Sequence, residues 1–424
     1  MTAPANATPW LGLVADDVTG ATDAASYAVA AGVPTAVFFG LPGDAVPIPP
    51  AACLVVALKT RSIPAGEAVD QSVRAAKLLL SQGVRLLYFK YCSTFDSTAR
   101  GNIGPVAAAL ADLVECPVTL VAPSAPANGR TVYQGHLFVG SQLLSESPMR
   151  DHPINPMTDS DLTRLLRAQT DRPVELLAHP DVAGGPEALR QRLRRQPAGT
   201  LLVADAISDD DLAALAGAAL DEGLPLVSGS AGLAHALARV RGRDQAAPVP
   251  ALPEGPYAVI SGSASAATRR QVEHYRSTHP SFVIDPIAVS DGVDVVGRVR
   301  DFLARHLPDG GPMVYSTAEP EQIAEVQRML GVDRAAALVE RTLAECAQAA
   351  VELGVRRLLV AGGETSGAVV ARLGIEVVHI GPMLDPGVCW SVSVGAHPLG
   401  LVLKSGNFGA PTLFERAASG YDGA

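Results

Sequence analysis

Short apolar segments alternate with polar turns and helical patterns along most of the chain. The apolar runs at 11–15, 84–89, 118–122 and 201–204 predict β-strands, and an alanine-rich pattern at 105–114 predicts one of the helices between them. Strands that alternate with helices of this length are typical of parallel sheets built from βαβ units. Ligands bind at the carboxyl ends of such strands, and we expect the polar loops of this chain to lie there.

A proline-rich segment at 245–256 interrupts the alternation. Proline resists both helix formation and sheet pairing, so this segment predicts a linker. The alternation resumes after it and is clear again at 357–372. We therefore predict two α/β domains, 9–245 and 255–424, each with a mostly parallel sheet flanked by helices. The glycine-rich, apolar stretch from Gly395 predicts no definite elements.

Composition narrows the range of partners. The 424 residues carry a net charge of −10 and no tract of lysine or arginine, which argues against nucleic acid or an anionic membrane as the main partner. The chain shows no secretory signal pattern, no apolar run long enough to span a bilayer, and no CxxC or zinc-binding spacing among its five cysteines. We therefore expect a cytoplasmic protein with reduced cysteines.

Two aspartates follow the first predicted strand. Asp16 and Asp17 come directly after it, and Thr19 and Gly20 open the next helix. Neighbouring side chains of an extended chain point to opposite faces, so one carboxylate can face a ligand as a general base or hydroxyl acceptor. Capping of the helix by one aspartate explains the pattern equally well. The sequence leaves both interpretations open.

Charged and hydroxyl side chains also gather in the loops after three other strands of the first domain. Arg61 follows the strand within 54–62, and arginine suits a bidentate grip on a carboxylate or phosphate. The other loops suit a small polyhydroxy acid, with cations for its carboxylate and Asp or Asn for its hydroxyls. Any one of these loops alone would favour an ordinary surface loop, and it is their combination that points to a ligand. Their candidate residues are Lys90, Asp96, Ser97, Thr98, Arg100 and Asn102 in one loop, and Asn128 and Arg130 in the other.

Turns rich in glycine and serine stand between a strand and a helix at 226–238, 259–272 and 359–371. Small residues let backbone N–H groups approach a ligand, and a helix N-terminus adds partial positive charge, so such turns can bind phosphate without a lysine. Two of the turns lie in the second domain, where a further glycine-containing run occupies 404–409. This combination predicts a site for nucleotide phosphates.

Several common signatures are absent. The chain has no GxxxxGK[ST] loop, no HRD and DFG pair, no GxSxG elbow, no HExxH and no GxGxxG after a strand. The missing dinucleotide fingerprint argues against an NAD-linked sugar-acid dehydrogenase. Spacing alone still leaves a kinase and such a dehydrogenase as close alternatives.

The motifs together resemble those of the four-carbon acid sugar kinases. They occur in the order found in that family, and the resemblance covers the chain from residue 11 onward. Two of them, YFKYCSTFDST and GRTVYQGHLFVG, are most similar to the branch that acts on 3-oxo-tetronate. The motifs are ADDVTGATDAA, FKYCSTFDSTARGNIGPV, NGRTVYQGHLFVG, SGSAS, AGGETSGAV and KSGNFG.

The resemblance implies an ATP-dependent kinase that phosphorylates the terminal C4 hydroxyl of 3-oxo-tetronate (3-dehydro-erythronate), with D-threonate and D-erythronate as alternative substrates. It implies that the first domain holds the acid sugar, that the second holds the nucleotide, and that the active site lies in the interdomain cleft. The glycine turns would cradle the phosphates, with Mg²⁺ bridging them and Glu364 as its candidate ligand. The implied ATP contacts are Ser261, Gly262, Ser263, Gly362, Gly363, Glu364, Thr365, Ser366 and Gly406.

The same hypothesis divides the acid-sugar residues by role. Arg61, Lys90 and Arg100 neutralise the substrate carboxylate. Asp96 and Asn102 order the hydroxyls, and Asp17 or Asp16 accepts the proton, with Asp96 as the alternative base. A non-catalytic sugar-acid binding protein is the rival interpretation, since it would bind the same ligand without releasing ADP. The oligomeric state is open, with a homodimer as one option.

Overall fold

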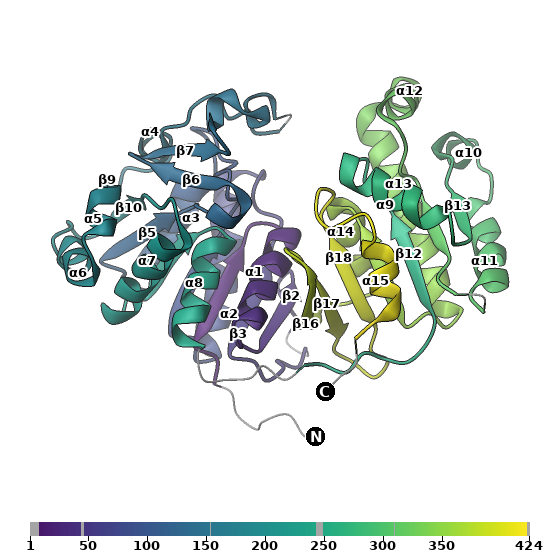
Figure 1. The fold of residues 1–424 in the computed structure, drawn as a ribbon, viewed down its shortest axis with the longest axis horizontal. Helices are drawn as coiled ribbons and strands as arrows, with labels where there is room; N and C mark the ends of the chain where they lie inside the picture. The colour runs from purple at the N-terminus through teal and green to yellow at the C-terminus, as the bar shows by residue number, and fades with distance from the viewer. Residues whose placement is uncertain (1–7, 44–45, 153, 243–248, 309, 422–424) are drawn as a thin grey trace. The chain divides into compact units, whose positions relative to one another are not determined.

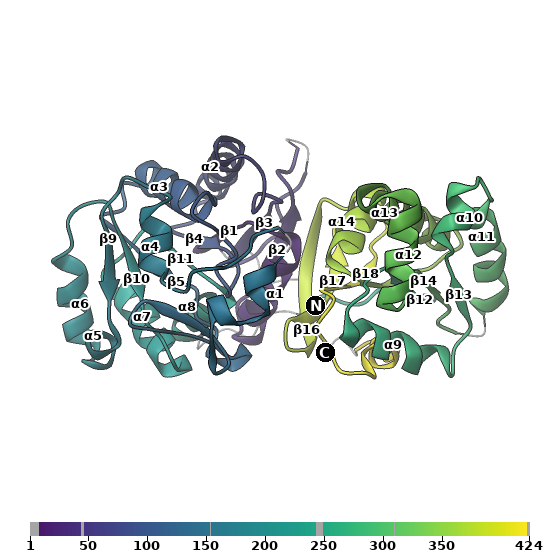
Figure 2. The ribbon, with the colours of Figure 1, turned by 90° about the horizontal axis from the view of Figure 1, so that it is seen from above.

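The computed structural model describes residues 8–43, 46–152, 154–242, 249–308 and 310–421. The chain divides into two compact units, Met1–Pro248 and Val249–Ala424. Each unit is a sheet with helices on both faces (Figures 1 and 2), which confirms the predicted α/β class. The predicted end of the first domain, at 245, lies outside the described residues, as does the first part of the predicted linker.

The N-terminal unit is built on a parallel sheet with the strand order β2-β3-β1-β4-β11-β5-β10-β9. Most of these strands are buried along their whole length, which explains why they appear in the sequence as continuous apolar runs. The strands are β1 (Leu11–Ala15), β2 (Thr35–Phe39), β3 (Cys53–Ala57), β4 (Leu86–Lys90), β5 (Val118–Ala122), β9 (Val174–Leu177), β10 (Thr200–Ala204) and β11 (Leu226–Gly229).

Helices cover both faces of this sheet, with α1, α7 and α8 on one face and α2 and α3 on the other (Figure 2). Their inward faces are rich in alanine, so the helices pack closely on the strands. The helices are α1 (Val18–Ala30), α2 (Ala65–Ser81), α3 (Ile103–Leu113), α4 (Leu162–Arg167), α5 (His179–Ala183), α6 (Pro186–Arg194), α7 (Asp209–Asp221) and α8 (Ala231–Arg241).

A small antiparallel sheet follows β5. It comprises β6 (Arg130–Tyr133), β7 (His136–Val139) and β8 (Gln142–Leu143). The buried carboxylate of Asp205 accepts hydrogen bonds from the N–H groups of Gln134 and Gly135 in the β6–β7 turn and of His179. This carboxylate therefore fixes the small sheet to the end of β10.

The C-terminal unit has the strand order β13-β14-β12-β15-β18-β17-β16. The first five strands are parallel, and β17 runs antiparallel to both of its neighbours. The strands are β12 (Tyr257–Ser261), β13 (Ser281–Val283), β14 (Met313–Tyr315), β15 (Arg357–Ala361), β16 (Val377–Asp385), β17 (Val388–Ser393) and β18 (Gly400–Lys404).

The aromatic residues of this unit concentrate in one core cluster. It includes Trp390, Tyr257, Tyr275 and Phe414, and packs α9 and α15 against the sheet. The chain beyond Gly395, for which the sequence predicted no definite elements, supplies β18 and α15. The helices are α9 (Ala266–Arg276), α10 (Pro286–Ser290), α11 (Val295–His306), α12 (Pro320–Leu330), α13 (Val332–Glu352), α14 (Gly363–Arg372) and α15 (Leu413–Ser419).

The sequence located the main elements to within two residues where it named them. The strand predicted at 84–89 is β4, and the helix predicted at 105–114 is α3. None of the helices in the described residues is both long and apolar enough to cross a membrane. The five cysteines all lie in described residues, and none forms a disulfide.

Gly229 tests the close packing of β11 against β5. A Cβ at this position would lie 2.2 Å from the Ala122 carbonyl oxygen and 2.8 Å from Tyr88 Oη. We expect Gly229→Ala to lower the free energy of unfolding by about 1–3 kcal/mol in urea titrations, since the added methyl has no space. Gly217→Ala, in α7 with no atom within 4 Å, is the control and should raise stability by up to about 1 kcal/mol. Equal effects of the two changes would contradict this packing.

Candidate active site

Strand register brings the residues that follow three strands to one edge of the N-terminal sheet. Ala15, at the end of β1, pairs with Ala57 of β3 on one side and with Lys90 of β4 on the other. The Asp16 N–H then donates to the Lys90 carbonyl, and the Asp16 carbonyl accepts from the Thr60 N–H. The polar residues just past these strands therefore meet, as expected for the carboxyl ends of parallel strands.

Arg61 lies at this edge and contacts three carboxylates. Its Nε and Nη2 atoms each donate to one oxygen of Asp16 at 2.8 Å. Nη2 also donates to Asp17 Oδ1 at 2.6 Å, and Nη1 donates to Asp96 Oδ2 at 3.3 Å. The structure thus brings the three predicted catalytic aspartates together around the arginine that was predicted to hold the substrate carboxylate. Most of the Arg61 donors are used within the protein, and its contact with substrate stays a prediction.

Burial and the guanidinium act in opposite directions on these carboxyls. Burial raises the pKa of Asp16, and Arg61 offsets this only in part. For Asp17, burial is outweighed by Arg61, Lys90 and local hydrogen bonds, which together hold its pKa well below the ordinary range. Burial would lower the pKa of Arg61, but the two aspartates raise it well above its usual value. Asp17 and Arg61 therefore form a persistent ion pair.

Asp17 also caps α1. Its backbone is extended, with φ −146° and ψ 155°, and Oδ2 accepts hydrogen bonds from the Gly20 N–H at 2.9 Å and from Thr19 Oγ1 at 2.8 Å. A side-chain cap of this kind contributes about 1 kcal/mol. The structure confirms that Asp17 caps the helix. A role for Asp17 as a general base stays a prediction.

Lys90 is buried, with its ammonium against the first turn of α1. Nζ donates to the Tyr91 carbonyl at 2.9 Å. A Cβ at Gly20 would lie 2.6 Å from Lys90 Nζ and 2.2 Å from Asp17 Oδ1, so glycine is required for this approach. An ammonium has three donors, and Tyr91 is the one acceptor that the described residues supply to it. Lys90 therefore has donors for an anionic ligand.

The loop before α3 is held by the protein itself. Asn102 Nδ2 donates to the Thr60 carbonyl at 2.7 Å and to two neighbouring carbonyls. Gln169 Nε2 donates to Ser97 Oγ at 3.0 Å and to the Thr98 carbonyl. The predicted role of Asn102 toward substrate hydroxyls would therefore fall to its Oδ1 atom.

Asp96 has an unusual backbone conformation. Its φ is 47° and that of Phe95 is 61°, in the left-handed region that residues other than glycine rarely adopt. Asp96 Oδ1 accepts from Asn155 Nδ2 at 3.1 Å, a residue that the sequence analysis did not single out. A cavity of about 10 Å³ beside Asp16, Arg61 and Asp96 has room for about one water molecule. The enclosed side of this cluster is therefore too small for a four-carbon acid.

The remaining predicted sugar-binding residues differ in exposure. Arg100 is exposed at the surface. Asn128 lies after β5, and its side chain lies near enough to the Tyr27 hydroxyl of α1 to act on the pKa of that group. Arg130 donates to the Asn128 carbonyl, while its buried Nε has no hydrogen-bond partner among the described residues. Asn128 thus reaches the same helix whose first turn contacts Lys90.

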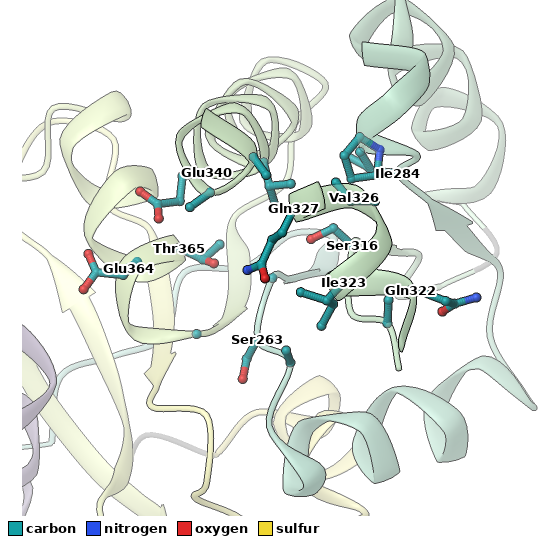
Figure 3. Close-up of a pocket in the computed structure, with 18 of the residues that line it drawn as sticks. Ser263, Ile284, Ser316, Gln322, Ile323, Val326, Gln327, Glu340, Glu364 and Thr365 are labelled. Atoms are coloured by element: carbon teal, nitrogen blue, oxygen red, sulfur yellow. The ribbon is translucent and has the colours of Figure 1, made fainter. Parts of the chain in front are cut away.

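The C-terminal unit contains a cavity of about 520 Å³ beside its two predicted phosphate turns (Figure 3). Two of the predicted ATP contacts, Ser261 and Ser366, are buried. The Ser261 hydroxyl hydrogen-bonds the Thr317 hydroxyl, and the Ser366 hydroxyl donates to the Val360 carbonyl. Six of the predicted ATP contacts line the cavity, namely Gly262, Ser263, Gly362, Gly363, Glu364 and Thr365.

The two turns meet at the carboxyl ends of β12 and β15. The N–H groups of Gly262 and Ser263 both donate to the Ala361 carbonyl. A Cβ at Gly262 would lie 2.3 Å from Thr365 Oγ1, and one at Gly362, whose φ is 128°, would lie 2.9 Å from the same atom. Gly362 gives α14 no side-chain cap. The N–H groups of the first turn of α14 therefore suit an anion.

Helices α12 and α13 form apolar walls of the cavity. Ile323 and Val326 come from α12 and Val339 from α13, while Ile284 follows β13. The Gln327 side chain reaches into the space between them (Figure 3). An apolar slot beside phosphate-binding turns fits a nucleoside. The sequence analysis missed these residues, because apolar positions that line a slot have the same helical spacing as those that fill a core.

A buried lysine fastens the glycine-containing run after β18 to α9. Lys404 Nζ donates to Thr268 Oγ1 at 2.7 Å, to Gln271 Oε1 at 2.8 Å and to the Gly406 carbonyl at 3.1 Å. Burial lowers the pKa of Lys404 to about 7. A Cβ at Gly406 would lie 2.6 Å from Ser263 Oγ. Gly406 therefore packs against the first phosphate turn, although it is not among the residues that line the cavity.

The described residues contain no group of three or more His, Cys, Asp or Glu side chains that could hold a metal ion. Glu364 is one exposed carboxylate at the cavity, next to the phosphate turns. Mg²⁺ in nucleotide sites commonly uses one or two carboxylates together with phosphate oxygens and water. The donor set fits a metal that is carried mainly by a nucleotide, and the predicted role of Glu364 as its protein ligand stays a prediction.

Comparison with known proteins places these two sites in context. A family model described as a sugar-binding N-terminal domain matches residues 11–237, and one described as a nucleotide-binding C-terminal domain matches residues 258–414. A 3-oxo-tetronate kinase from Burkholderia multivorans is 47% identical, with 100% of each chain covered. Another from Pseudomonas fluorescens is 46% identical, with 97% of each covered.

Solved structures agree with this relationship. A Salmonella typhimurium protein, solved under the provisional name of a tRNA synthase, has 41% identity and a TM-score of 0.89, covering 97% of this chain and 99% of its own. A Haemophilus influenzae protein has 40% identity and a TM-score of 0.84 over 96% and 99%. The fold and the relatives define a two-domain phosphotransferase with an alcohol acceptor. The chain belongs to the four-carbon acid sugar kinase family, as its motifs indicated.

Removal of Arg61 tests its hold on the carboxylates. We expect Arg61→Ala to lower the free energy of unfolding by about 3–5 kcal/mol at pH 7, because it leaves buried carboxylates without their partner. Without the guanidinium, burial acts on Asp16 and Asp17 with less opposition and raises their pKa values in the folded state, so the loss should shrink as the pH falls toward 4. Urea titrations at pH 7 and pH 5 measure both effects.

The control for this change is Arg74→Ala. Arg74 pairs with Asp70 on the surface of α2, with both side chains more than half exposed. A pair of this kind contributes about 0.3–0.5 kcal/mol. Equal losses for the two variants at pH 7 would show that Arg61 does not organise the cluster.

Proposed function

We propose that this chain transfers the terminal phosphoryl group of ATP to the C4 hydroxyl of 3-oxo-tetronate and releases the 4-phosphate and ADP. The observation that carries the proposal is the 47% identity to a 3-oxo-tetronate kinase over the full length of both chains. The two sites support it, since one unit offers charged side chains suited to a small acid and the other a nucleoside-sized cavity beside two phosphate turns. The same proposal places the protein in the cytoplasm.

In the N-terminal unit, the buried Lys90 ammonium supplies the cation for the substrate carboxylate, with the exposed Arg100 as a second donor. The proposed contacts to the substrate hydroxyls are completed by Ser97, Thr98, Asn102, Asn128 and Arg130. Arg61 would act mainly by fixing the positions of the aspartates rather than by gripping substrate. Fixed positions matter because phosphoryl transfer depends on alignment and charge neutralisation more than on covalent chemistry.

In the C-terminal unit, the nucleoside would occupy the apolar slot between α12 and α13, with its phosphates at the turns of Gly262–Ser263 and Gly362–Thr365. Backbone N–H groups at the start of α14 would face the phosphate oxygens. Mg²⁺, held by the phosphates and by Glu364, would neutralise charge on the transferred group. Ser261, Ser366 and Gly406 would support these turns from behind.

Release of ADP tests the proposed reaction. We expect the purified protein with Mg·ATP to release ADP at the highest kcat/KM with 3-oxo-tetronate, and more slowly with D-threonate and D-erythronate, because the site is expected to recognise the oxidation state at C3. A coupled ADP assay measures all three, with no acid as the control. Thermal stabilisation by the acids without any ADP release would instead indicate a binding protein.

The apolar slot gives a second test. Val339→Trp would fill it and should raise the KM for ATP about tenfold or more, which corresponds to about 1.4 kcal/mol of lost binding. The KM for the acid should stay within twofold. Val332→Trp is the matched control, since Val332 begins the same helix, is 59% exposed and is not among the lining residues. An unchanged ATP KM in Val339→Trp would remove the nucleoside from this cavity.

A further inference from the structure

Every carboxylate oxygen of the three clustered aspartates accepts a hydrogen bond from the protein. Both oxygens of Asp16 accept from Arg61. Asp17 uses one oxygen for Arg61 and the other for the cap of α1. Asp96 uses one oxygen for Arg61 and the other for Asn155. A carboxylate that takes a proton must turn a lone pair toward the donor, and on each of these oxygens a protein donor already uses at least one of the two lone pairs and fixes the direction of the oxygen.

A fourth carboxylate stands beside the cluster and lacks such partners. Asp23 belongs to the ADDVTGATDAA motif and lies three residues after Gly20, one turn further along the same face of α1. Its Oδ1 atom is buried and has no hydrogen-bond partner among the described residues, although the residue as a whole is partly exposed. Buried carboxylate oxygens in native structures are rarely left without a donor. A ligand hydroxyl would supply the missing donor.

The surroundings of Asp23 suit a hydroxy acid. The Lys90 ammonium lies against the same helix face at Gly20 and attracts the carboxylate. Tyr27 stands one turn beyond Asp23 on α1, and the Asn128 side chain lies near enough to its hydroxyl to act on the Tyr27 pKa. One cation, one open carboxylate and a hydroxyl–amide pair thus line one face of α1. They come from three segments that the sequence links to the sugar site.

We propose that Asp23 is the general base that accepts the proton of the substrate hydroxyl, in place of Asp16, Asp17 or Asp96. This inference rests on the proposed function. As the C4 oxygen forms its bond to the γ-phosphorus, its proton passes to the Asp23 carboxylate. The bond between the γ-phosphorus and the bridging oxygen breaks, and ADP leaves with that electron pair. The proton on Asp23 is then released to solvent.

The charges around Asp23 agree with this role. Burial raises its pKa from 3.8 to about 6, Lys90 opposes the rise, and Asp17 adds to it. Among the described residues, the other titratable groups near this face include Tyr27 on the same helix and His235 of α8, which packs on Tyr27. The charge of Asp209, at the start of α7, acts on both of them, and Arg239 of α8 acts on His235. A base is most effective when its pKa lies near the working pH. Asp17, whose pKa is held far lower, binds a proton too weakly for this task.

Asp23→Asn tests the proposal against 3-oxo-tetronate. We expect kcat to fall about 10²–10⁴-fold, with the ATP KM within twofold of the wild type. The acid limb of the kcat/KM profile near pH 6 should disappear. Asp70→Asn, an exposed aspartate on α2, is the matched control and should leave the rate and pH profile unchanged.

Thermal stability separates a base from a structural carboxylate. The folded-state pKa of Asp23 lies above the unfolded value, so ionisation of Asp23 destabilises the fold as the pH rises from about 4 through 6. Asp23→Asn removes this penalty and should raise the Tm at pH 8 relative to the wild type, with a smaller difference at pH 4. A lower Tm at pH 8 would mark Asp23 as structural and overturn the proposal.

The outcomes distinguish the two proposals. An active wild type together with an Asp23→Asn variant that keeps more than a tenth of kcat, or keeps the acid limb, overturns the role of Asp23 alone. A wild type that releases no ADP with 3-oxo-tetronate, D-threonate or D-erythronate overturns the proposed function, and the role of Asp23 with it.

Discussion

The contact of one guanidinium with three buried carboxylates is the constraint on which the N-terminal site depends. Carboxylates at the ends of neighbouring parallel strands repel one another, and Arg61 is the cation that the described residues place among Asp16, Asp17 and Asp96. Hydrogen bonds with well-aligned geometry offset the free-energy cost of burying these charges. The planar guanidinium of Arg61 forms a bidentate pair with Asp16 and a further bond to Asp17. The loops after β1, β3 and β4 are fixed relative to one another by these contacts.

The two units prepare for anions in different ways. The N-terminal unit uses side-chain charges, with Lys90 buried against α1 and the aspartates held by Arg61. The C-terminal unit uses backbone, since the glycine turn before α14 brings the N–H groups of that helix to the edge of a largely apolar cavity. A short acid with hydroxyls needs specific side chains to order it, whereas a phosphate chain is bound well by helix N-termini and a metal. This difference matches a kinase that must select its acceptor but can bind ATP generically.

The aspartates near the N-terminal site fall into two groups, those whose oxygens accept hydrogen bonds from the protein and one with an oxygen that does not. The aspartates that the sequence predicted to be catalytic are hydrogen-bonded to Arg61, and one of them also caps a helix, so these contacts hold the loops in place. Asp23, which looks like an ordinary polar position on a helix, has the open oxygen. A carboxylate that is satisfied by the protein stabilises the fold, while one left open for a ligand lowers its stability. Functional sites in proteins commonly lower the stability of the fold in this way.

The sequence by itself determined the α/β class, the two-unit organisation, the positions of the glycine turns and the family, because local patterns of apolar runs, glycines and ordered motifs encode each of these. It also named Arg61, Asp16, Asp17 and Asp96 as polar groups at strand ends. Only the tertiary structure decided that Arg61 bonds to all three aspartates, that α12 and α13 wall a cavity, and that the charge of Lys90 acts on Asp23. Those facts depend on strand register and helix packing between residues distant in the chain, which no local pattern encodes.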